Sequence, residues 1–125
     1  FVVEMGGKGN IEKIENAIFE TVEKYNLKAK KCWFFPTPEE KTKLLEKYGL
    51  KVKRMISFPR PTLLPTGIKG WLQTFSAPVL VNVPVEMHEK LIDEITEKVE
   101  KELERNENGQ ILADYVRLRF EAVKE

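Results

Sequence analysis

The protein is a chain of 125 residues, which suffices for one domain of ordinary size and hardly for two. Its 21 lysines and arginines nearly balance 20 aspartates and glutamates, so a net charge of +1 gives no reason to expect nucleic acid or an anionic membrane as a partner. One cysteine and one histidine exclude a Cys/His zinc site and an internal disulfide, and no apolar run resembles a membrane span or signal peptide. We therefore expect a cytoplasmic domain without a metal.

The first half of the chain predicts a strand followed by two helices. Residues 1–5 form an apolar run typical of a buried strand, and the glycine-rich residues 6–10 predict a tight loop. Asn10 is a suitable N-cap for the amphipathic helix that follows. After an extended aromatic segment, Thr37 begins a second helix as the first residue of a capping box, and Gly49 ends it.

The second half predicts two further helices between two strands. The expected elements are a strand over Leu50–Phe58, an irregular proline-rich segment over 59–67, a short helix over 68–75, a long amphipathic helix over 84–105 and a last strand over Ile111–Val123. Strict alternation along the first of these strands would place Met55 on the face opposite Val52. In the last strand, Arg117 and Arg119 share one face, and a glutamate on a covering helix is their expected partner.

This order of elements predicts an α/β architecture with three proper strands. Three strands would make a thin sheet for so much helix. The chain also begins inside an apolar, strand-like run, whereas the ends of domains normally lie at the surface. We therefore expect a piece of a larger domain.

Two kinds of segment are candidates for binding a small ligand. The loop over 6–10 precedes a helix, where backbone amides bind anions, but its glycines match neither a Walker loop nor a dinucleotide fingerprint. Arg60 lies between two prolines on a stiff backbone, which suits a carboxylate or phosphate ligand as well as a plain surface position. Trp33 and Trp71 lie in segments near strand ends, where open α/β sheets place ligand pockets.

Five segments, taken in their order, resemble a known enzyme family. They are Phe1–Asn10, Phe35–Glu40, Phe58–Thr62, Gly67–Leu72 and Ala113–Arg119. Together they resemble the C-terminal half of the class I S-adenosylmethionine-dependent methyltransferases of the small-molecule type, the group near trans-aconitate methyltransferase. The resemblance implies a partial Rossmann-like methyltransferase sheet with flanking helices, in which the last strand is antiparallel and lies between the other two.

The resemblance also implies an organisation of the chain. Residues 1–5, 50–58 and 111–123 would match the fifth, sixth and seventh strands of the family. Residues 1–125 would then form a single domain, the C-terminal portion of a larger methyltransferase domain, with residues 59–83 as a substrate-side insertion.

On this resemblance the chain carries the substrate side of the enzyme. The residues to which the resemblance assigns substrate binding are Asn10, Trp33, Arg60, Thr62, Trp71 and Tyr115. For a carboxylic acid substrate, Arg60 is the expected anchor and Tyr115 the expected hydrogen-bond partner. The family binds S-adenosylmethionine through segments upstream of this chain. We therefore expect no cofactor-binding residue here, no cofactor binding by the chain alone and no activity of the chain alone.

The expected partners are a small-molecule substrate and a second copy of the chain. Half of the parent sheet would be absent, so an exposed sheet edge or an apolar helix face would favour a homodimer. The alternative function is a stand-alone α/β module that binds an anion through the loop Gly6–Asn10 or serves only for dimerisation.

Overall fold

The computed structural model describes residues 1–124, which divide into two compact units. Unit 1 comprises residues 1–10, 34–60 and the C-terminal segment from Tyr115. Unit 2 comprises Ile11–Trp33 and Pro61–Asp114. The predicted insertion over 59–83 therefore begins in unit 1 and continues in unit 2, and its role stays a prediction, as does the single-domain assignment.

Unit 1 is a three-stranded sheet with one helix. The strands are β1 (Val2–Gly6), β2 (Leu50–Pro59) and β5 (Val116–Lys124), and the helix is α2 (Pro38–Lys47). The sheet order is β1-β5-β2, and β5 pairs antiparallel with both neighbours. This α/β arrangement is compatible with part of a Rossmann-like fold, although its order is not that of a parallel Rossmann sheet.

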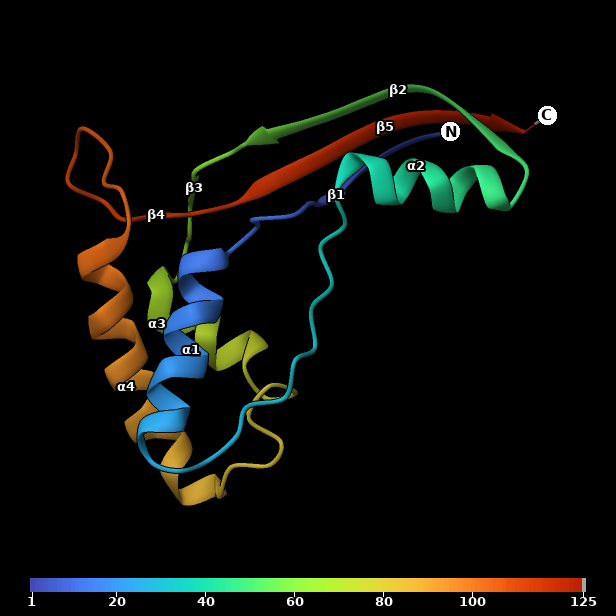
Figure 1. The fold of residues 1–125 in the computed structure, drawn as a ribbon. Helices are drawn as coiled ribbons and strands as arrows, with labels where there is room; N and C mark the ends of the chain where they lie inside the picture. Colours follow the sequence, from blue (N-terminus) through green and yellow to red (C-terminus); the bar gives the residue numbers. More distant parts are fainter. Residues whose placement is uncertain (125) are drawn as a thin grey trace. The chain divides into compact units, whose positions relative to one another are not determined.

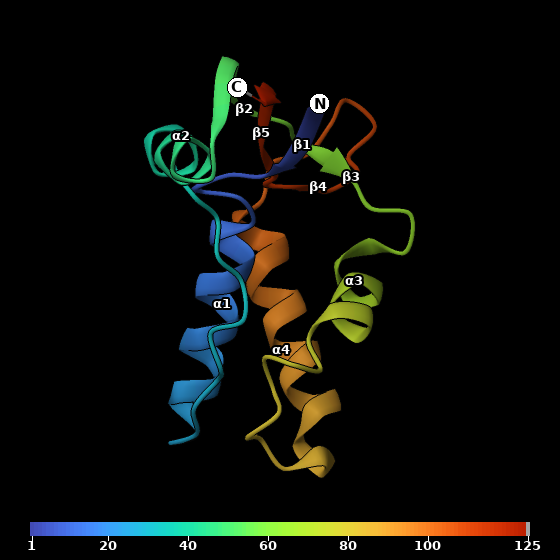
Figure 2. The same ribbon diagram turned by 90° about the vertical axis from the view of Figure 1, so that its right-hand side faces the viewer.

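Helix α2 covers one face of this sheet (Figures 1 and 2). The predicted capping box is confirmed, because the Thr37 hydroxyl accepts from Glu40 N and the Glu40 carboxylate accepts from Thr37 N, both at 3.1 Å. Gly49 follows the helix with φ of 83°, a left-handed conformation that favours glycine. Leu45 of α2 packs with Phe120 and Ala122 of β5 to form the core of the unit.

A β-bulge in β2 corrects the predicted alternation. Val52 pairs with Ala122 and Arg54 with Glu121, so Lys53 is the extra residue between them. Met55 therefore lies on the same face as Val52 and packs against the core with it. The prediction failed because one inserted residue moves every later side chain to the other face.

Unit 2 is mainly helical. Its helices are α1 (Glu12–Lys24), α3 (Gly67–Phe75) and α4 (Val85–Glu102), and a two-stranded sheet joins β3 (Thr62–Leu63) to β4 (Leu112–Ala113). The core positions of the two long helices recur at helical spacing and are buried: Ile14, Ile18 and Val22 in α1, and Leu91, Ile95 and Val99 in α4. None of the helices within residues 1–124 is long and apolar enough to cross a membrane.

The start of α1 and the last predicted strand both depart from expectation. The N-cap is Ile11, with φ of 49° and no side-chain cap, and not Asn10. Asp114 supplies the missing acceptors, because its carbonyl accepts from Ile11 N at 2.9 Å and its Oδ2 from Lys13 N at 2.7 Å. The strand expected over Ile111–Val123 is interrupted at Asp114 and Tyr115, which separate β4 from β5. The segment 59–67, expected to be irregular, contains β3.

Candidate functional site

The carboxyl ends of β1 and β2 lie at one edge of the sheet in unit 1. Both strands are antiparallel to β5, so they run parallel to each other. β1 ends at Gly6, opposite Arg117, and β2 ends at Pro59, opposite Val116. Open α/β sheets place ligands at the carboxyl ends of their strands. This edge is therefore the candidate site in unit 1.

Three of the predicted substrate residues lie at this edge. The backbone N–H of Arg60 donates to the carbonyl of Tyr115 at 2.7 Å, so these two residues are neighbours. Asn10 is buried, and its Oδ1 accepts from Val116 N at 2.7 Å. The Asn10 side chain thus fixes the first residue of β5.

The Arg60 side chain is held in place by two neighbours in unit 1. Its NH1 lies 3.1 Å from Glu4 Oε1, and its guanidinium lies 5.3 Å from the centre of the Phe58 ring. The side chain keeps 51% of its surface exposed. A guanidinium placed in this way is accessible and presents a planar fork that matches a carboxylate.

Glu4 is also approached by two arginines of β5. Arg117 Nε lies 3.6 Å from Glu4 Oε1, and Arg119 NH2 lies 3.6 Å from Oε2. Three guanidinium groups therefore surround one carboxylate, which leaves the cluster positively charged. Glu4 Oε1 is shielded from solvent and accepts no hydrogen bond within residues 1–124, so these contacts are ionic. The surplus of positive charge favours an anionic ligand.

Sequence reasoning missed Glu4 as the centre of this cluster. It expected the partner of Arg117 and Arg119 to lie on a covering helix, whereas the partner is on the neighbouring strand β1. The register places Glu4 directly opposite Arg119. Glu4 was detectable as the one charged residue in an apolar run, but its partners depend on pairing between the two ends of the chain.

The glycine-rich loop after β1 is packed against its own unit. Gly7 N donates to Val116 O and Lys8 N to Pro36 O, both at 3.0 Å, and Asn10 N donates to Gly7 O at 2.9 Å. A Cβ on Gly6 would stand only 2.7 Å from the Phe35 ring. The glycine is thus required by packing, and three amides that an anion would need are already engaged. These contacts argue against the anion-binding interpretation of the loop.

The remaining predicted residues lie in unit 2. The rings of Trp33 and Trp71 are 5.8 Å apart, and Trp71 also lies 5.1 Å from the ring of Phe75. Trp71 is buried, whereas Phe75 is half exposed. Thr62 belongs to β3 and pairs with Ala113. Unit 2 thus brings Trp33 and Trp71 together in an aromatic cluster, while Thr62 lies in its small sheet.

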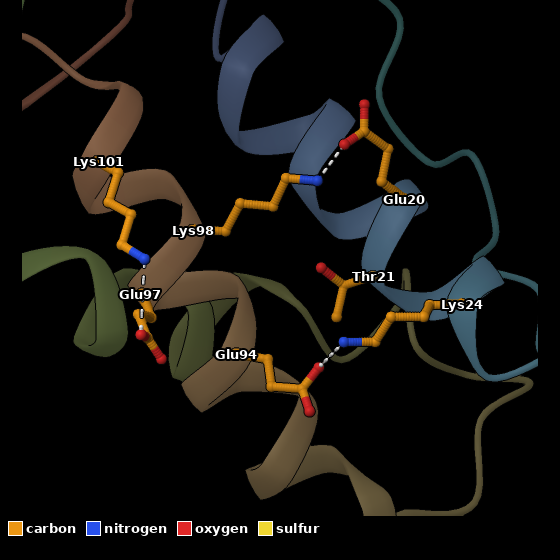
Figure 3. A pocket seen from close by; sticks show the side chains of 7 residues that line it. All are labelled: Glu20, Thr21, Lys24, Glu94, Glu97, Lys98 and Lys101. Carbon is orange, nitrogen blue, oxygen red and sulfur yellow. Dashed lines mark hydrogen bonds and ion pairs between the residues drawn. The ribbon is translucent and has the colours of Figure 1, made fainter.

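A groove of about 440 Å³ separates α1 from α4 in unit 2 (Figure 3). Its lining has three lysines and three glutamates besides Thr21, namely Lys24, Lys98, Lys101, Glu20, Glu94 and Glu97. Since charges of the two signs are equal in number, the groove has no excess charge to attract an ion.

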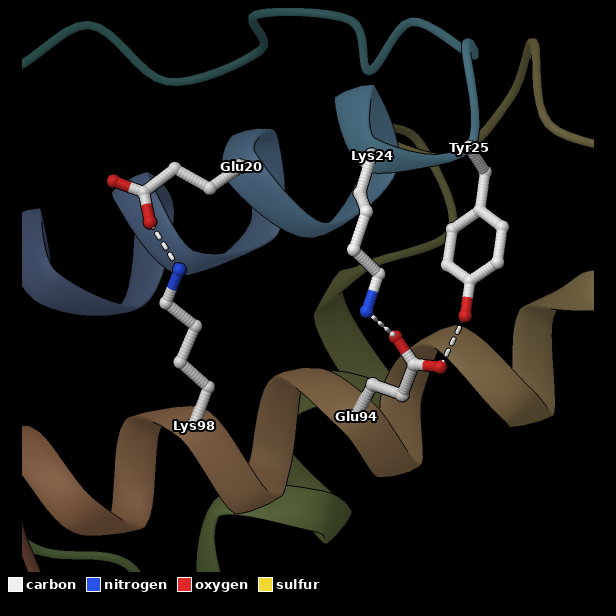
Figure 4. A network of polar contacts seen from close by, with 5 residues as sticks. All are labelled: Glu20, Lys24, Tyr25, Glu94 and Lys98. Atoms are coloured by element: carbon white, nitrogen blue, oxygen red, sulfur yellow. Dashed lines mark hydrogen bonds and ion pairs between the residues drawn. The ribbon is translucent and has the colours of Figure 1, made fainter.

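Ion pairs link the two helices across this groove. Tyr25 donates a hydrogen bond to Glu94, Lys24 Nζ lies 3.1 Å from Glu94 Oε2, and Lys98 pairs with Glu20 (Figure 4). The hydrogen bond from Tyr25 and the neighbouring Lys24 lower the pKa of Glu94. We interpret this groove as a solvent-filled gap between two packed helices and not as a ligand site. Within residues 1–124, no group of His, Cys, Asp and Glu side chains could hold a metal ion.

Comparison with known proteins identifies a distant relative. The chain matches no established protein-family profile. It is 28% identical, over 130 aligned positions that include the whole chain, to an uncharacterized methyltransferase of Schizosaccharomyces pombe. The chain spans 49% of the length of that protein. The match supports a relationship to methyltransferases and no finer assignment.

Proposed function

We propose that the chain is the substrate-side, C-terminal part of an S-adenosylmethionine-dependent methyltransferase that acts on a small molecule. The observation that carries this proposal is the match of the whole chain to about half of a methyltransferase. The sheet order β1-β5-β2, with an antiparallel strand in the middle, supports it, because this is the order that the family resemblance implies for the last three strands.

The described residues do not fit the cofactor. The one glycine-rich loop after a strand, Gly6–Asn10, uses its amides within unit 1, and the ring of Phe35 fills the space beside Gly6. The chain alone is therefore proposed to bind no S-adenosylmethionine and to be inactive. Binding of the methyl donor is assigned to the part of the parent protein that this chain does not include.

The substrate side is assigned to the carboxyl edge of the sheet. Arg60 is proposed to anchor a carboxylate of the substrate, because its guanidinium is exposed and belongs to a cluster with surplus positive charge. Tyr115, whose carbonyl accepts from Arg60 N, is proposed to donate its hydroxyl to the same ligand. Methyl transfer depends mainly on proximity and orientation of the two reactants. A residue that positions the substrate can therefore govern the rate without entering the chemistry.

The test uses the complete protein encoded by the gene, with S-adenosylmethionine labelled in its methyl group and a panel of small carboxylic acids. We expect label to move to one of these acids. The variant Arg60→Gln should raise KM about tenfold or more, because a charge-assisted hydrogen bond contributes about 1.5–3 kcal/mol, with a smaller change in kcat. Arg105→Gln in unit 2 is the matched control and should leave both constants unchanged. An unaltered KM in Arg60→Gln would refute the role of this arginine.

A further inference from the structure

Asn108 and Gly109 form the tip of a loop in unit 2 that the proposed function does not use. The loop connects α4 to β4, and its two ends meet in a β-bridge between Arg105 and Ile111. Gly109 N donates to Asn106 O at 2.9 Å, which closes a β-turn at the tip. Gly109 has φ of 77°, and both tip residues are exposed. The tip is thus a tight turn that water can reach.

The side-chain amide of Asn108 lacks the restraints that hold the side-chain amide of Asn106. Asn106 Oδ1 accepts from Asn108 N at 2.9 Å and from Gln110 N at 3.0 Å. Asn106 Nδ2 also donates to the Gln110 side chain at 3.1 Å. The side-chain amide of Asn108, by contrast, makes no hydrogen bond within the described part of the chain. Its Cγ is therefore available to a nucleophile.

The nearest nucleophile to an asparagine Cγ is the backbone nitrogen of the following residue. Attack by this nitrogen closes a five-membered ring, and a side chain on the following residue hinders the approach. Glycine has no side chain and a flexible backbone. No atom lies within 4 Å of the position that a Cβ on Gly109 would occupy, so the ring has room to form. Of the six asparagines in the chain, Asn108 is the one that precedes a glycine.

We propose that Asn108 is a site of spontaneous deamidation. The Gly109 nitrogen loses its proton and bonds to Asn108 Cγ, while Nδ2 takes up a proton and leaves as ammonia. Water then opens the succinimide ring on either side of its nitrogen and leaves aspartate or isoaspartate at position 108. The net reaction consumes one water molecule and releases one molecule of ammonia. The inference goes beyond methyl transfer and does not rest on it.

The β-turn slows this reaction without preventing it. Gly109 N is engaged with Asn106 O, and Asn106 Oδ1 holds Asn108 N, so the turn must open before the nitrogen reaches Cγ. Exposed turns open locally at a much lower free-energy cost than the whole fold. The rate in the folded protein should therefore be lower than in the unfolded chain but measurable.

The modification changes both the charge and the backbone of the loop. A carboxylate replaces a neutral amide, so the net charge of the chain falls from +1 to 0. The isoaspartate form also inserts a methylene group into the backbone of the turn. That insertion should break the hydrogen bond from Gly109 N to Asn106 O.

The test is incubation of the intact protein in warm, mildly alkaline buffer, followed by ion-exchange chromatography and peptide mass spectrometry. We expect a growing species with one additional negative charge, whose mass shows that OH has replaced NH2. Fragment ions should place the change at Asn108 and leave Asn106, in the same loop, unmodified. The rate should rise with pH, because the attacking nitrogen must lose its proton.

Three variants test the chemistry and the role of the turn. Asn108→Gln would need a six-membered ring and should slow the reaction at least about tenfold. Glu107→Gln keeps the asparagine and the glycine, and this matched control should react at the rate of the wild type. Asn106→Ala should react faster, because it releases Asn108 N and loosens the turn. Circular dichroism of each variant would verify that its fold is unchanged.

Several outcomes would overturn the proposal. Equal rates in the wild type and Asn108→Gln would do so, as would modification at Asn106 in place of Asn108. A folded wild type that stays unmodified while its urea-unfolded chain reacts would show that the turn prevents the attack. A slower reaction in Asn106→Ala would contradict the slowing effect assigned to the turn.

Discussion

Among single residues, Asp114 has the clearest structural task. It directly follows β4 and supplies two hydrogen-bond acceptors to the start of α1. The N-cap residue Ile11 has no side chain that could do this. Its other carboxylate oxygen, Oδ1, is buried and accepts no hydrogen bond within residues 1–124. Burial raises the pKa of Asp114 above its ordinary 3.8, although the hydrogen bond from Lys13 N opposes this rise. The carboxylate is thus needed as a hydrogen-bond acceptor, while the burial of its negative charge lowers the stability of the folded state.

We predict that Asp114→Asn removes a pH dependence from the stability of the protein. The folded state binds the Asp114 proton more tightly than the unfolded state, because the folded pKa is the higher one. The difference in the free energy of unfolding between the wild type and Asp114→Asn should therefore favour the wild type most at pH values below the ordinary pKa of Asp114. This difference should fall as pH rises through the raised pKa of the folded state, and it should stay constant at higher pH. Urea unfolding at a series of pH values measures this difference.

Asp114→Ala is the companion variant. It removes the acceptor of Lys13 N and should lower the free energy of unfolding by about 1 kcal/mol throughout, as loss of a helix cap does. A difference between wild type and Asp114→Asn that rises with pH would show that the hydrogen bond outweighs burial at this carboxylate.

Among the elements, β2 shows how one extra residue sets the faces of a strand. Leu50, Val52 and Met55 all pack toward the core, which strict alternation forbids. The bulge at Lys53 resolves this, and it also places Arg54 and Ile56 on the face opposite α2, where Ile56 pairs with Arg119. The faces of the second half of β2 therefore depend on the bulge.

We predict that deletion of Lys53 is tolerated better than deletion of Lys51. Without Lys53, residues 52 and 54 become direct neighbours and every observed pairing is kept, so the free energy of unfolding should stay within about 1 kcal/mol of the wild type. Without Lys51, Leu50 moves to the face opposite α2, which should cost about 2 kcal/mol. Urea unfolding of the two deletion variants measures both values. Equal losses would contradict the assignment of the bulge.

Local patterns in the sequence were enough to predict the helix of unit 1 and the approximate positions of its strands. The capping box at Thr37 and the glycine at position 49 bound α2 because both signals act within one helical turn. The bulge at Lys53 could not be predicted, since it depends on which residues of β5 lie opposite. The N-cap assigned to Asn10 failed for a similar reason. Its side chain binds Val116, far along the chain, and leaves α1 to Asp114.

The candidate site was predicted in part. The constraint of two prolines on Arg60 is local, and the structure places this residue at the carboxyl edge beside Tyr115. Glu4, by contrast, meets its arginines only because β1 pairs with the last strand. No local pattern specifies that pairing. The substrate roles of the six predicted residues remain predictions.

For the molecule as a whole, the outer edge of β1 is a candidate surface for binding a partner. It pairs with β5 along one edge, and no strand within residues 1–124 pairs with its other edge. Phe1 and Ala122 exchange both of their backbone hydrogen bonds, so the alternation of an antiparallel ladder directs the amides of Val2 and Glu4 toward the unpaired edge. Such an edge favours pairing with a second copy. We propose a homodimer through β1.

Light scattering after size-exclusion chromatography tests this proposal. We expect a mass twice the 14.5 kDa of one chain. Val2→Pro should give a monomer, because proline removes one outward N–H and leaves the bonds to β5 intact. A monomeric wild type at high concentration, or a dimer that survives in Val2→Pro, would exclude pairing through this edge.

We propose that these residues form the substrate side of a methyltransferase whose cofactor site lies elsewhere in the parent protein. The decisive measurement is a calorimetric titration with S-adenosylmethionine of the complete gene product, verified by its intact mass, and of the 125-residue chain. We expect saturable binding by a complete product that is longer than this chain, and no binding by the chain alone. Binding by the chain alone would refute this proposal, and so would failure of the longer product to bind.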